Sequence, residues 1–327
     1  MRRALLVGIN YNGTSSQLYG CINDINNIGT YLFTVRKYNS FIVMTDTSSI
    51  KPTRANILAG FKALLRGAVS GDELWFHFSG HGNLVRDNNG DEESGSDSTI
   101  CPLDYMRSGF ITDDIIRNNL ASLIPKGVRL YIVLDACHSG TGCDLRYKYD
   151  DASYLANKLS PIPEKYIPTD WALQQTNYEF KRYNKTAGEV FCISGCQDTQ
   201  TSADAFFDRQ ASGALTYILL TCLHNNPQTT YKWKHLLKDI CCNEKIYRFT
   251  QRTALTSGNI LNLEDSIFTP SLPTRESKIS SRNMDLDTNT HIITNHDTNT
   301  SSTTHDISLS RTVNHDPNMK KLYINYI

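Results

Sequence analysis

Residues 72–82 read Asp-Glu-Leu-Trp-Phe-His-Phe-Ser-Gly-His-Gly, an apolar run that stops at a glycine-rich turn. A second apolar run, residues 130–134, leads into Asp-Ala-Cys-His-Ser-Gly at 135–140. Short apolar runs bounded by turn residues are typical of buried strands. Because the carboxyl ends of parallel strands meet at one edge of a sheet, we expect both polar stretches at the edge where α/β proteins bind ligands.

The rest of the chain up to about residue 268 alternates between strand-like and helix-like stretches. Further buried strands are predicted at 3–9, 41–45, 190–194 and 253–255. Apolar residues at helical spacing predict helices at 22–31, 52–65, from 112, at 213–223 and at 231–241. This alternation predicts an α/β fold with a mostly parallel central sheet flanked by helices on both faces.

Two segments depart from this alternation. Residues 146–188 are rich in Tyr, Lys, Pro and Asn without a steady period, and we expect an insertion or linker there between 1–145 and 189–268. In 269–327, Ser, Thr, Asn, Asp and His dominate. Such a composition cannot bury enough apolar surface to order itself, so this tail is predicted to be disordered.

Composition narrows the functional classes. The 33 Lys and Arg balance the 33 Asp and Glu, which disfavours a nucleic-acid or membrane-surface binder. The nine cysteines lack the paired spacing of a zinc site, and free thiols fit a reducing compartment. The apolar runs at 4–9 and 217–223 are too short for a signal peptide or a membrane span. We therefore expect a soluble, cytoplasmic monomer without an organic cofactor.

His81 and Cys137 are the candidate catalytic residues, because both follow predicted strands at the same sheet edge. A thiol beside an imidazole is the minimum for a nucleophile with a general base. The backbone N–H groups of Gly82 and Cys137 are candidates for an oxyanion hole. Taken singly, a buried cysteine is more often an inert packing residue, so the pairing carries the prediction. His77, inside the strand, and His138, directly after the thiol, are poorly placed to act as the base.

Residues 79–82 and 135–140 resemble the catalytic signatures of metacaspases, which are caspase-fold cysteine peptidases. Further blocks resemble the family in family order, and they lie at 4–11, 20–24, 52–57, 90–93, 194–198 and 200–204. The resemblance covers about residues 3–268 and implies a caspase-like fold. Because the first predicted strand begins at residue 3, we expect no N-terminal prodomain. It implies that 1–145 corresponds to the large subunit and 189–268 to the small one, with 146–188 as a candidate autoprocessing region.

The resemblance also implies roles for individual residues. His81 would be the general acid/base, and Cys137 the nucleophile of amide hydrolysis through a thioester. The family cleaves after Arg or Lys, and the positions matching its S1 pocket are Cys21, Asp24, Ser79 and Asp135. Two carboxylates can pair with a guanidinium or ammonium group. On the residues alone, Asp24 would instead be the N-terminal cap of a helix and Asp135 a turn former.

A calcium requirement is implied by four further aspartates. Asp97, Asp113, Asp114 and Asp144 match a calcium site of the family, and carboxylates are the hard ligands that Ca²⁺ prefers. On the residues alone, Asp113 and Asp114 would simply favour a helix N-terminus. Residues 87–98 do not form an EF-hand loop, because the sixth position is not Gly and the twelfth is Ser98. Ala136 and Ser96 stand where the family usually has Ser and Tyr.

The segment 146–188 offers basic residues at which such an enzyme could cut itself. The candidates are Arg146, Lys148, Lys158, Lys165, Lys181, Arg182 and Lys185. An insertion that is never cut remains the alternative. For the whole chain, the alternatives are a catalytically inactive caspase-fold binding protein and a paracaspase-like peptidase. The His-Asp pairs at 296, 305 and 315 leave open a metal-binding tail.

Overall fold

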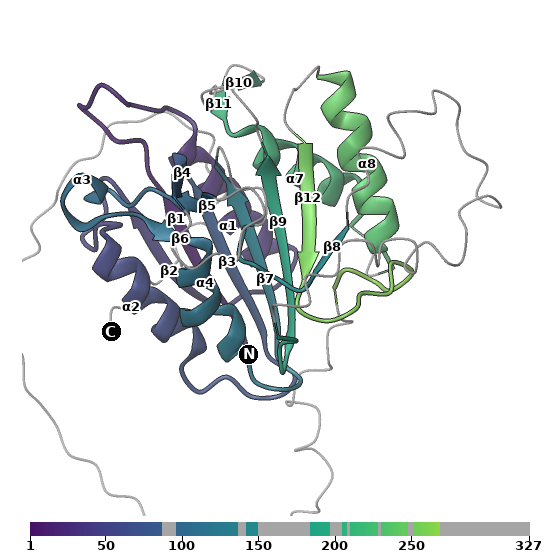
Figure 1. Cartoon of the computed structure of the whole chain (residues 1–327). Helices are drawn as coiled ribbons and strands as arrows, with labels where there is room; N and C mark the ends of the chain where they lie inside the picture. The colour runs from purple at the N-terminus through teal and green to yellow at the C-terminus, as the bar shows by residue number, and fades with distance from the viewer. Residues whose placement is uncertain are drawn as a thin grey trace, which may run out of the picture. The chain divides into compact units, whose positions relative to one another are not determined.

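A computed structural model describes residues 1–86, 96–136, 142–149, 184–196, 205–207, 210–227, 230–247 and 252–268 (Figure 1). Its main sheet has seven strands in the order β2-β1-β3-β7-β9-β12-β8. The strands are β1 (Arg2–Gly8), β2 (Ser40–Thr45), β3 (Glu73–Ser79), β7 (Arg129–Asp135), β8 (Tyr147–Tyr149), β9 (Glu189–Cys196) and β12 (Arg252–Ser257). Strands β2, β1, β3, β7 and β9 run parallel, whereas β12 is antiparallel to β9 and β8. The predicted mostly parallel α/β fold is confirmed.

Helices pack against both faces of this sheet. They are α1 (Cys21–Thr34), α2 (Arg54–Leu65), α4 (Asp113–Asn119), α7 (Ala214–Asn225) and α8 (Trp233–Ile246), with a short α3 (Tyr105–Ser108). Alternate residues of β1 enter two hydrophobic clusters, because successive side chains of a strand point to opposite faces. Ala4 and Leu6 pack with residues of α1, α7 and α8, whereas Leu5 and Val7 pack with residues of α2 and α4.

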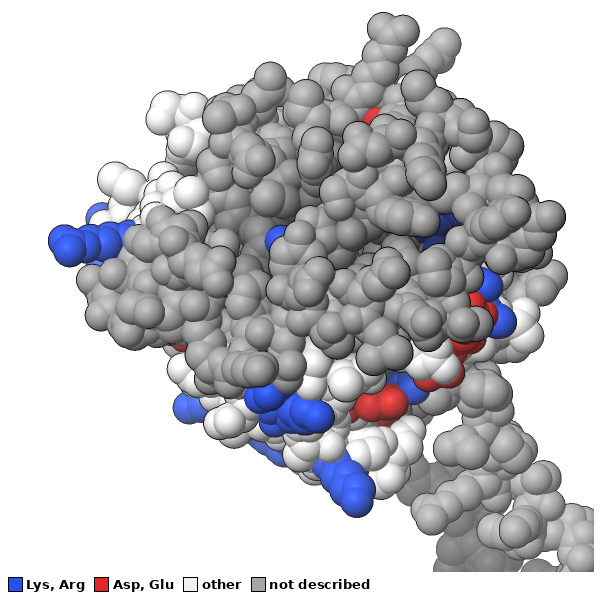
Figure 2. Space-filling view, turned by 45° about the vertical axis from the view of Figure 1, so that its right-hand side comes forward, with Lys and Arg blue, Asp and Glu red and all other residues white. Residues whose placement is uncertain are grey.

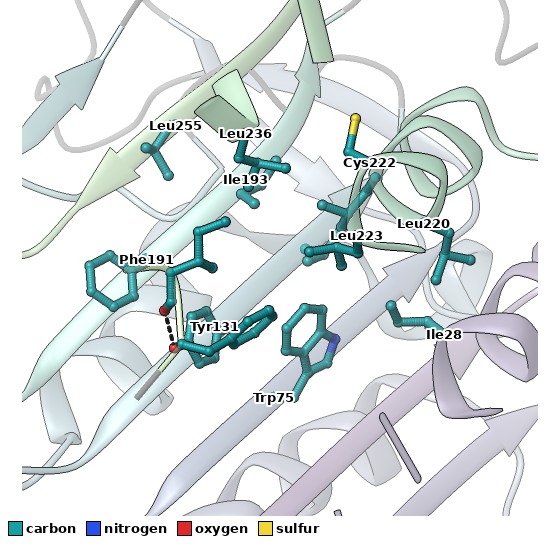
Figure 3. Packing of buried hydrophobic residues seen from close by; sticks show 14 of the residues in the cluster. Ile28, Trp75, Tyr131, Phe191, Ile193, Leu220, Cys222, Leu223, Leu236 and Leu255 are labelled. Atoms are coloured by element: carbon teal, nitrogen blue, oxygen red, sulfur yellow. Dashed lines mark hydrogen bonds between the residues drawn. The ribbon is translucent and has the colours of Figure 1, made fainter. Parts of the chain in front are cut away.

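Large aromatic side chains fill the cluster beneath α7 and α8 (Figure 3). The ring of Tyr131 lies 5.4 Å from that of Trp75 and 5.6 Å from that of Phe191, measured between centroids. The Tyr131 hydroxyl donates a hydrogen bond of 2.6 Å to the carbonyl of Ile267. Because these rings come from β3, β7 and β9, they bind the strands of 1–145 to the first strand of 189–268 in one sheet.

Three small features of the fold were not predicted. Strands β4 (Gly82–Arg86), β5 (Ser96–Ile100) and β6 (Ile111–Thr112) form a separate sheet, and β10 (Ala205–Phe207) pairs with β11 (Gln210–Ser212). Edge strand β8 uses the first residues of the segment expected to be an insertion. Tyr147 and Tyr149 are buried on one side of β8 and Lys148 lies between them. Three residues are too few for an alternating pattern to be recognised.

The predicted insertion and the predicted disordered tail lie mostly outside the described residues. The parts outside are residues 150–183 of the expected insertion and the tail from 269 onward, with its His-Asp pairs. In the described part of the chain, no helix combines the length and apolar character that crossing a membrane demands. Figure 2 shows both basic and acidic side chains on the described surface of one face, as a chain without net charge would have.

Candidate active site

The two candidate catalytic loops leave neighbouring strands at the same level of the sheet. Ser79 ends β3 and pairs with Asp135, which ends β7. The backbone N–H of Gly80 then donates to the Asp135 carbonyl at 3.2 Å. In the sequence, His81 lies two positions after Ser79, and Cys137 lies two positions after Asp135. Cys137 itself lies outside the described residues, and the register shows only that the ends of β3 and β7, from which the two loops start, are adjacent.

The imidazole of His81 is held by the loop that follows β1. Its Nε2 atom is 2.7 Å from the carbonyl oxygen of Ser16, and this contact requires a proton on Nε2 because a carbonyl only accepts. The neutral ring therefore presents Nδ1 as its acceptor. The ring is only partly exposed and lies 4.7 Å from the ring of Tyr11, between centroids. This tautomer leaves Nδ1 available as a base.

Tyr11 fixes the backbone of the same histidine. Its hydroxyl accepts a hydrogen bond of 3.0 Å from the His81 N–H and donates one of 2.6 Å to the Cys101 carbonyl. Burial raises the pKa of the Tyr11 phenol well above its usual 10, so the donor proton is retained. Sequence reasoning missed Tyr11 and Ser16 as neighbours of the histidine. Their only signal was the turn at 10–13, which ends a strand at this edge.

The candidate oxyanion-hole residues are described only in part. Gly82 opens β4, pairs with Ile100 and is partly exposed. The other donor, Cys137, lies outside the described residues. His77, discounted from the sequence, is fully buried, and its Nε2 contacts the Thr216 hydroxyl at 3.0 Å. Burial lowers the pKa of His77 to about 3, so this ring is uncharged.

Three of the four candidate S1 residues meet at one point. Asp24 lies in the first turn of α1, yet it does not cap that helix: the N-cap residue is Gly20, and the Ile22 N–H donates to the Asn10 side chain at 3.3 Å. The Asp24 carboxylate instead accepts a hydrogen bond of 2.6 Å from the Ser79 hydroxyl and two longer ones from the Gly213 N–H. The hydroxyl of Ser212 donates to it as well. The structure thus contradicts a capping role for Asp24, although the residue does lie at the start of α1.

Asp135 lies beside Asp24 and is nearly as buried. Its carboxylate accepts a hydrogen bond of 2.7 Å from the Thr216 N–H, in the first turn of α7. The pKa of Asp24 is raised from 3.8 to about 7, first by burial and second by the charge of Asp135. The fourth candidate, Cys21, opens α1 and is buried in the same cluster as Tyr11. The site therefore contains two neighbouring acidic groups that are costly to charge together.

The four aspartates of the expected calcium site are near one another but do not form a preformed cluster. Asp97, Asp113 and Asp144 are buried, and Asp114 is partly exposed. Burial and Cys192 raise the pKa of the Cys143 thiol most, and the charges of Asp144 and Asp113 raise it further, so both aspartates lie close to it. Within the described ranges, no three His, Cys, Asp or Glu side chains are gathered closely enough to hold a metal ion. The donors suit calcium chemically, but they would have to approach one another to bind it.

Hydrogen bonds tie these aspartates into the surrounding elements. The Asp113 carboxylate accepts from the N–H groups of Ser98, at 2.9 Å, and of Asp114. The Thr112 hydroxyl caps α4, as the sequence predicted. The Arg117 side chain donates to the Asp144 carbonyl at 2.9 Å. Helix α4 is thus bound to β5 at its start and, through Arg117 in its last turn, to the segment around Asp144.

The candidate self-cleavage positions differ in accessibility. Lys148 is paired with Thr256 within the sheet, and Arg146 is partly buried beside the Tyr147 ring. Lys185 is exposed. The remaining candidates, Lys158, Lys165, Lys181 and Arg182, lie outside the described residues.

Comparisons with known proteins give a consistent result. A family model described as "Metacaspase, peptidase C14 domain" matches residues 2–146. Metacaspase-1 of Botryotinia fuckeliana is 36% identical over 290 residues, which cover 80% of this chain and 68% of the relative. Metacaspase-1 of Coccidioides immitis is 35% identical over 290 residues and is covered to 62%. The solved structure of protein GSU0716 from Geobacter sulfurreducens has a TM-score of 0.53 at 23% identity, with 82% of this chain and 98% of that chain covered.

Proposed function

The chain belongs to the metacaspase, peptidase C14 family of cysteine peptidases, and from this premise we propose that it cleaves peptide bonds after Arg or Lys. The observation that carries the proposal is the pair of buried carboxylates, Asp24 and Asp135, beside the candidate dyad. Two acidic groups attract a basic substrate side chain and repel an acidic one. Protein substrates with a basic residue before the scissile bond therefore fit this pocket.

Cys137 is the proposed nucleophile and His81 its general base. The Nδ1 atom of His81 takes the thiol proton while Nε2 keeps its hydrogen bond to the Ser16 carbonyl. The thiolate then attacks the substrate carbonyl, and the imidazolium returns the proton to the leaving amine. A water molecule, deprotonated by the same ring, hydrolyses the thioester and releases the thiol. The N–H groups of Gly82 and Cys137 are the proposed donors to the oxyanion.

Calcium is the proposed activator. Asp97, Asp113, Asp114 and Asp144 would supply the oxygen ligands of this hard, divalent cation. Because Asp113 opens α4 and Asp144 follows the loop of Cys137, drawing these carboxylates together would pull that loop toward α4. Ligand binding would thus favour an ordered arrangement of the active-site edge.

Self-cleavage within 146–188 is the second proposed consequence of this specificity. The segment carries several basic residues. Its residue Tyr147 is level with Ser257 and Phe191, toward the amino ends of the parallel strands, so a cut here requires chain motion or a second molecule of the enzyme. Among the described candidates, the exposed Lys185 suits a protease, whereas Lys148 is held in β8. A substrate has to leave a sheet before it can enter an active site, so we expect cleavage to avoid Lys148 in the folded chain.

The test uses matched fluorogenic peptides that end in Arg, Lys or Asp, with and without millimolar Ca²⁺. We expect cleavage of the Arg and Lys peptides only, and none by Cys137→Ala. Efficient cleavage after Asp without cleavage after Arg would refute the proposed specificity. Full activity in excess chelator would refute the role of calcium.

A further inference from the structure

Residues 212–216, where β11 ends and α7 begins, bind both carboxylates of the proposed S1 pocket. Ser212 ends β11, Gly213 precedes α7, and Thr216 lies in the first turn of α7. The Ser212 hydroxyl and the Gly213 N–H donate to Asp24, the latter at 3.0 and 2.9 Å. The Thr216 N–H donates to Asp135 at 2.7 Å. The acids of the pocket and the groups that hold them therefore come from distant parts of the sequence.

Glycine is required at position 213 because the neighbouring atoms leave no room for a side chain, and not because of the backbone conformation. Its φ of −67° and ψ of 141° are accessible to every L-residue. A Cβ atom at this position would lie 2.3 Å from Oδ2 of Asp135 and 2.8 Å from Oδ2 of Asp24. Both carboxylates thus press against the same face of this residue, and their Oδ2 atoms are at most about 5 Å apart. A larger residue would displace at least one acid.

The hydroxyl of Ser212 favours the charged form of Asp24, one of the two carboxylates. Burial and the neighbouring Asp135 raise the pKa of Asp24, whereas hydrogen bonds from Ser212, Ser79 and Gly213 lower it. Donors of this kind stabilise the carboxylate form. The Asn23 side chain also donates to the Ala211 carbonyl at 3.1 Å, which anchors β11 to α1 and keeps these donors in position.

We propose that Ser212 and Gly213 are specificity-determining residues, which hold Asp24 and Asp135 together as a receptor for a guanidinium or ammonium group. Neither residue is assigned contact with the reacting atoms; both act through the two carboxylates. The inference rests on the proposed preference for basic residues. It predicts that loss of the Ser212 hydroxyl weakens recognition of the substrate's charge more than recognition of its shape.

The experiment compares two peptides that differ only in Arg or citrulline before the scissile bond, since citrulline has the shape of arginine without its charge. In Ser212→Ala, we expect the Arg-to-citrulline ratio of kcat/KM at pH 7 to fall by roughly tenfold, the effect of one charge-assisted hydrogen bond. The acidic limb of the Arg profile should move to higher pH, because Asp24 keeps its proton longer. Ser212→Thr, which keeps the hydroxyl, should restore both. Gly213→Ala should also lower the Arg-to-citrulline ratio of kcat/KM.

Matched controls separate the possible failures. Ser257→Ala removes another buried hydroxyl, on β12, and should leave the ratio at the wild-type value. If Ser212→Ala does not fold by circular dichroism, Ser212→Cys supplies a weaker donor of similar size. Equal activity of wild type on both peptides would refute the preference for basic residues itself. The inference would be overturned if Ser212→Ala kept both the wild-type Arg-to-citrulline ratio of kcat/KM and the wild-type acidic limb. It would also be overturned if kcat/KM fell equally on both peptides. Neither result would affect the proposed function.

Discussion

Replacing Asp24 by Asn should stabilise the fold at alkaline pH and impair the enzyme. The pKa of this buried carboxyl is raised from 3.8 to about 7, so the folded chain binds the proton more tightly than the unfolded chain. The corresponding stability is present below about pH 4 and is lost as the pH rises through 7. At 1.36 kcal/mol per pKa unit, that loss amounts to as much as about 4 kcal/mol. Asn has no such proton to lose.

The expected result is a stability difference that depends on pH. Between pH 4 and pH 8, the unfolding free energy of Asp24→Asn should gain up to about 4 kcal/mol relative to wild type, which corresponds to several degrees in Tm. The same substitution should lower kcat/KM for Arg peptides by roughly 10- to 150-fold, the equivalent of about 1.5–3 kcal/mol for a hydrogen bond to a charged group. Stability and activity should therefore change in opposite directions.

The assay is thermal unfolding followed by circular dichroism at pH 4 and pH 8, with Cys137→Ala in every chain to prevent self-digestion. Kinetics on Arg peptides use the active forms. Asp265→Asn, at an exposed position, is the control and should show no such gain between the two pH values. A stability difference that is constant with pH, or that moves in favour of wild type at pH 8, would refute the electrostatic reasoning. Unchanged kcat/KM would refute the role of Asp24 in substrate binding.

The remaining predictions concern the dyad, its support and its activation. Cys137→Ala and His81→Ala should each abolish peptide hydrolysis, and the double variant should be no worse, because the two groups act as one unit; substantial activity in Cys137→Ala would disprove the nucleophile. Tyr11→Phe leaves two buried polar groups without their partner, and we expect kcat to fall by roughly 5- to 100-fold with little change in KM; an unchanged kcat would show that the hydroxyl does not position His81. Added Ca²⁺ should generate new N-termini within 146–188, after Lys185 before Lys148, in wild type and not in Cys137→Ala; an intact chain in active enzyme would exclude self-processing.

The main sheet could be predicted because its strands are buried on both faces. All seven residues of β3 are buried, and its large apolar side chains, Leu74, Trp75, Phe76 and Phe78, therefore stand out in the sequence. Strand β4 reads Gly-Asn-Leu-Val-Arg, which does not alternate between polar and apolar residues, and none of its five residues is buried. Such a strand owes its position to pairing with β5 and not to burial. Local pattern does not reveal partners of that kind.

The candidate site was predictable in its residue types and not in its contacts. The glycine-rich turn after β3 identified His81, and the resemblance to a family identified Asp24. Nothing local to Asp24 indicated that its carboxylate would bind Ser212 and Gly213, which follow it by almost 190 positions. The Tyr11 hydroxyl likewise joins His81 and Cys101 across the sheet edge. Contacts between distant segments depend on how the strands are ordered, which a single sequence leaves open.

The most direct test of the central claim is covalent labelling by a peptide fluoromethyl ketone that ends in Arg, read by mass spectrometry of tryptic fragments. The account predicts one adduct per chain, on the Cys137 thiol, and none on the other eight cysteines. The adduct should be lost in His81→Ala and should not form with the corresponding Asp reagent. An adduct on a different cysteine, or equal labelling by the Asp reagent, would contradict the assignment of Cys137 as the nucleophile of a peptidase for basic substrates.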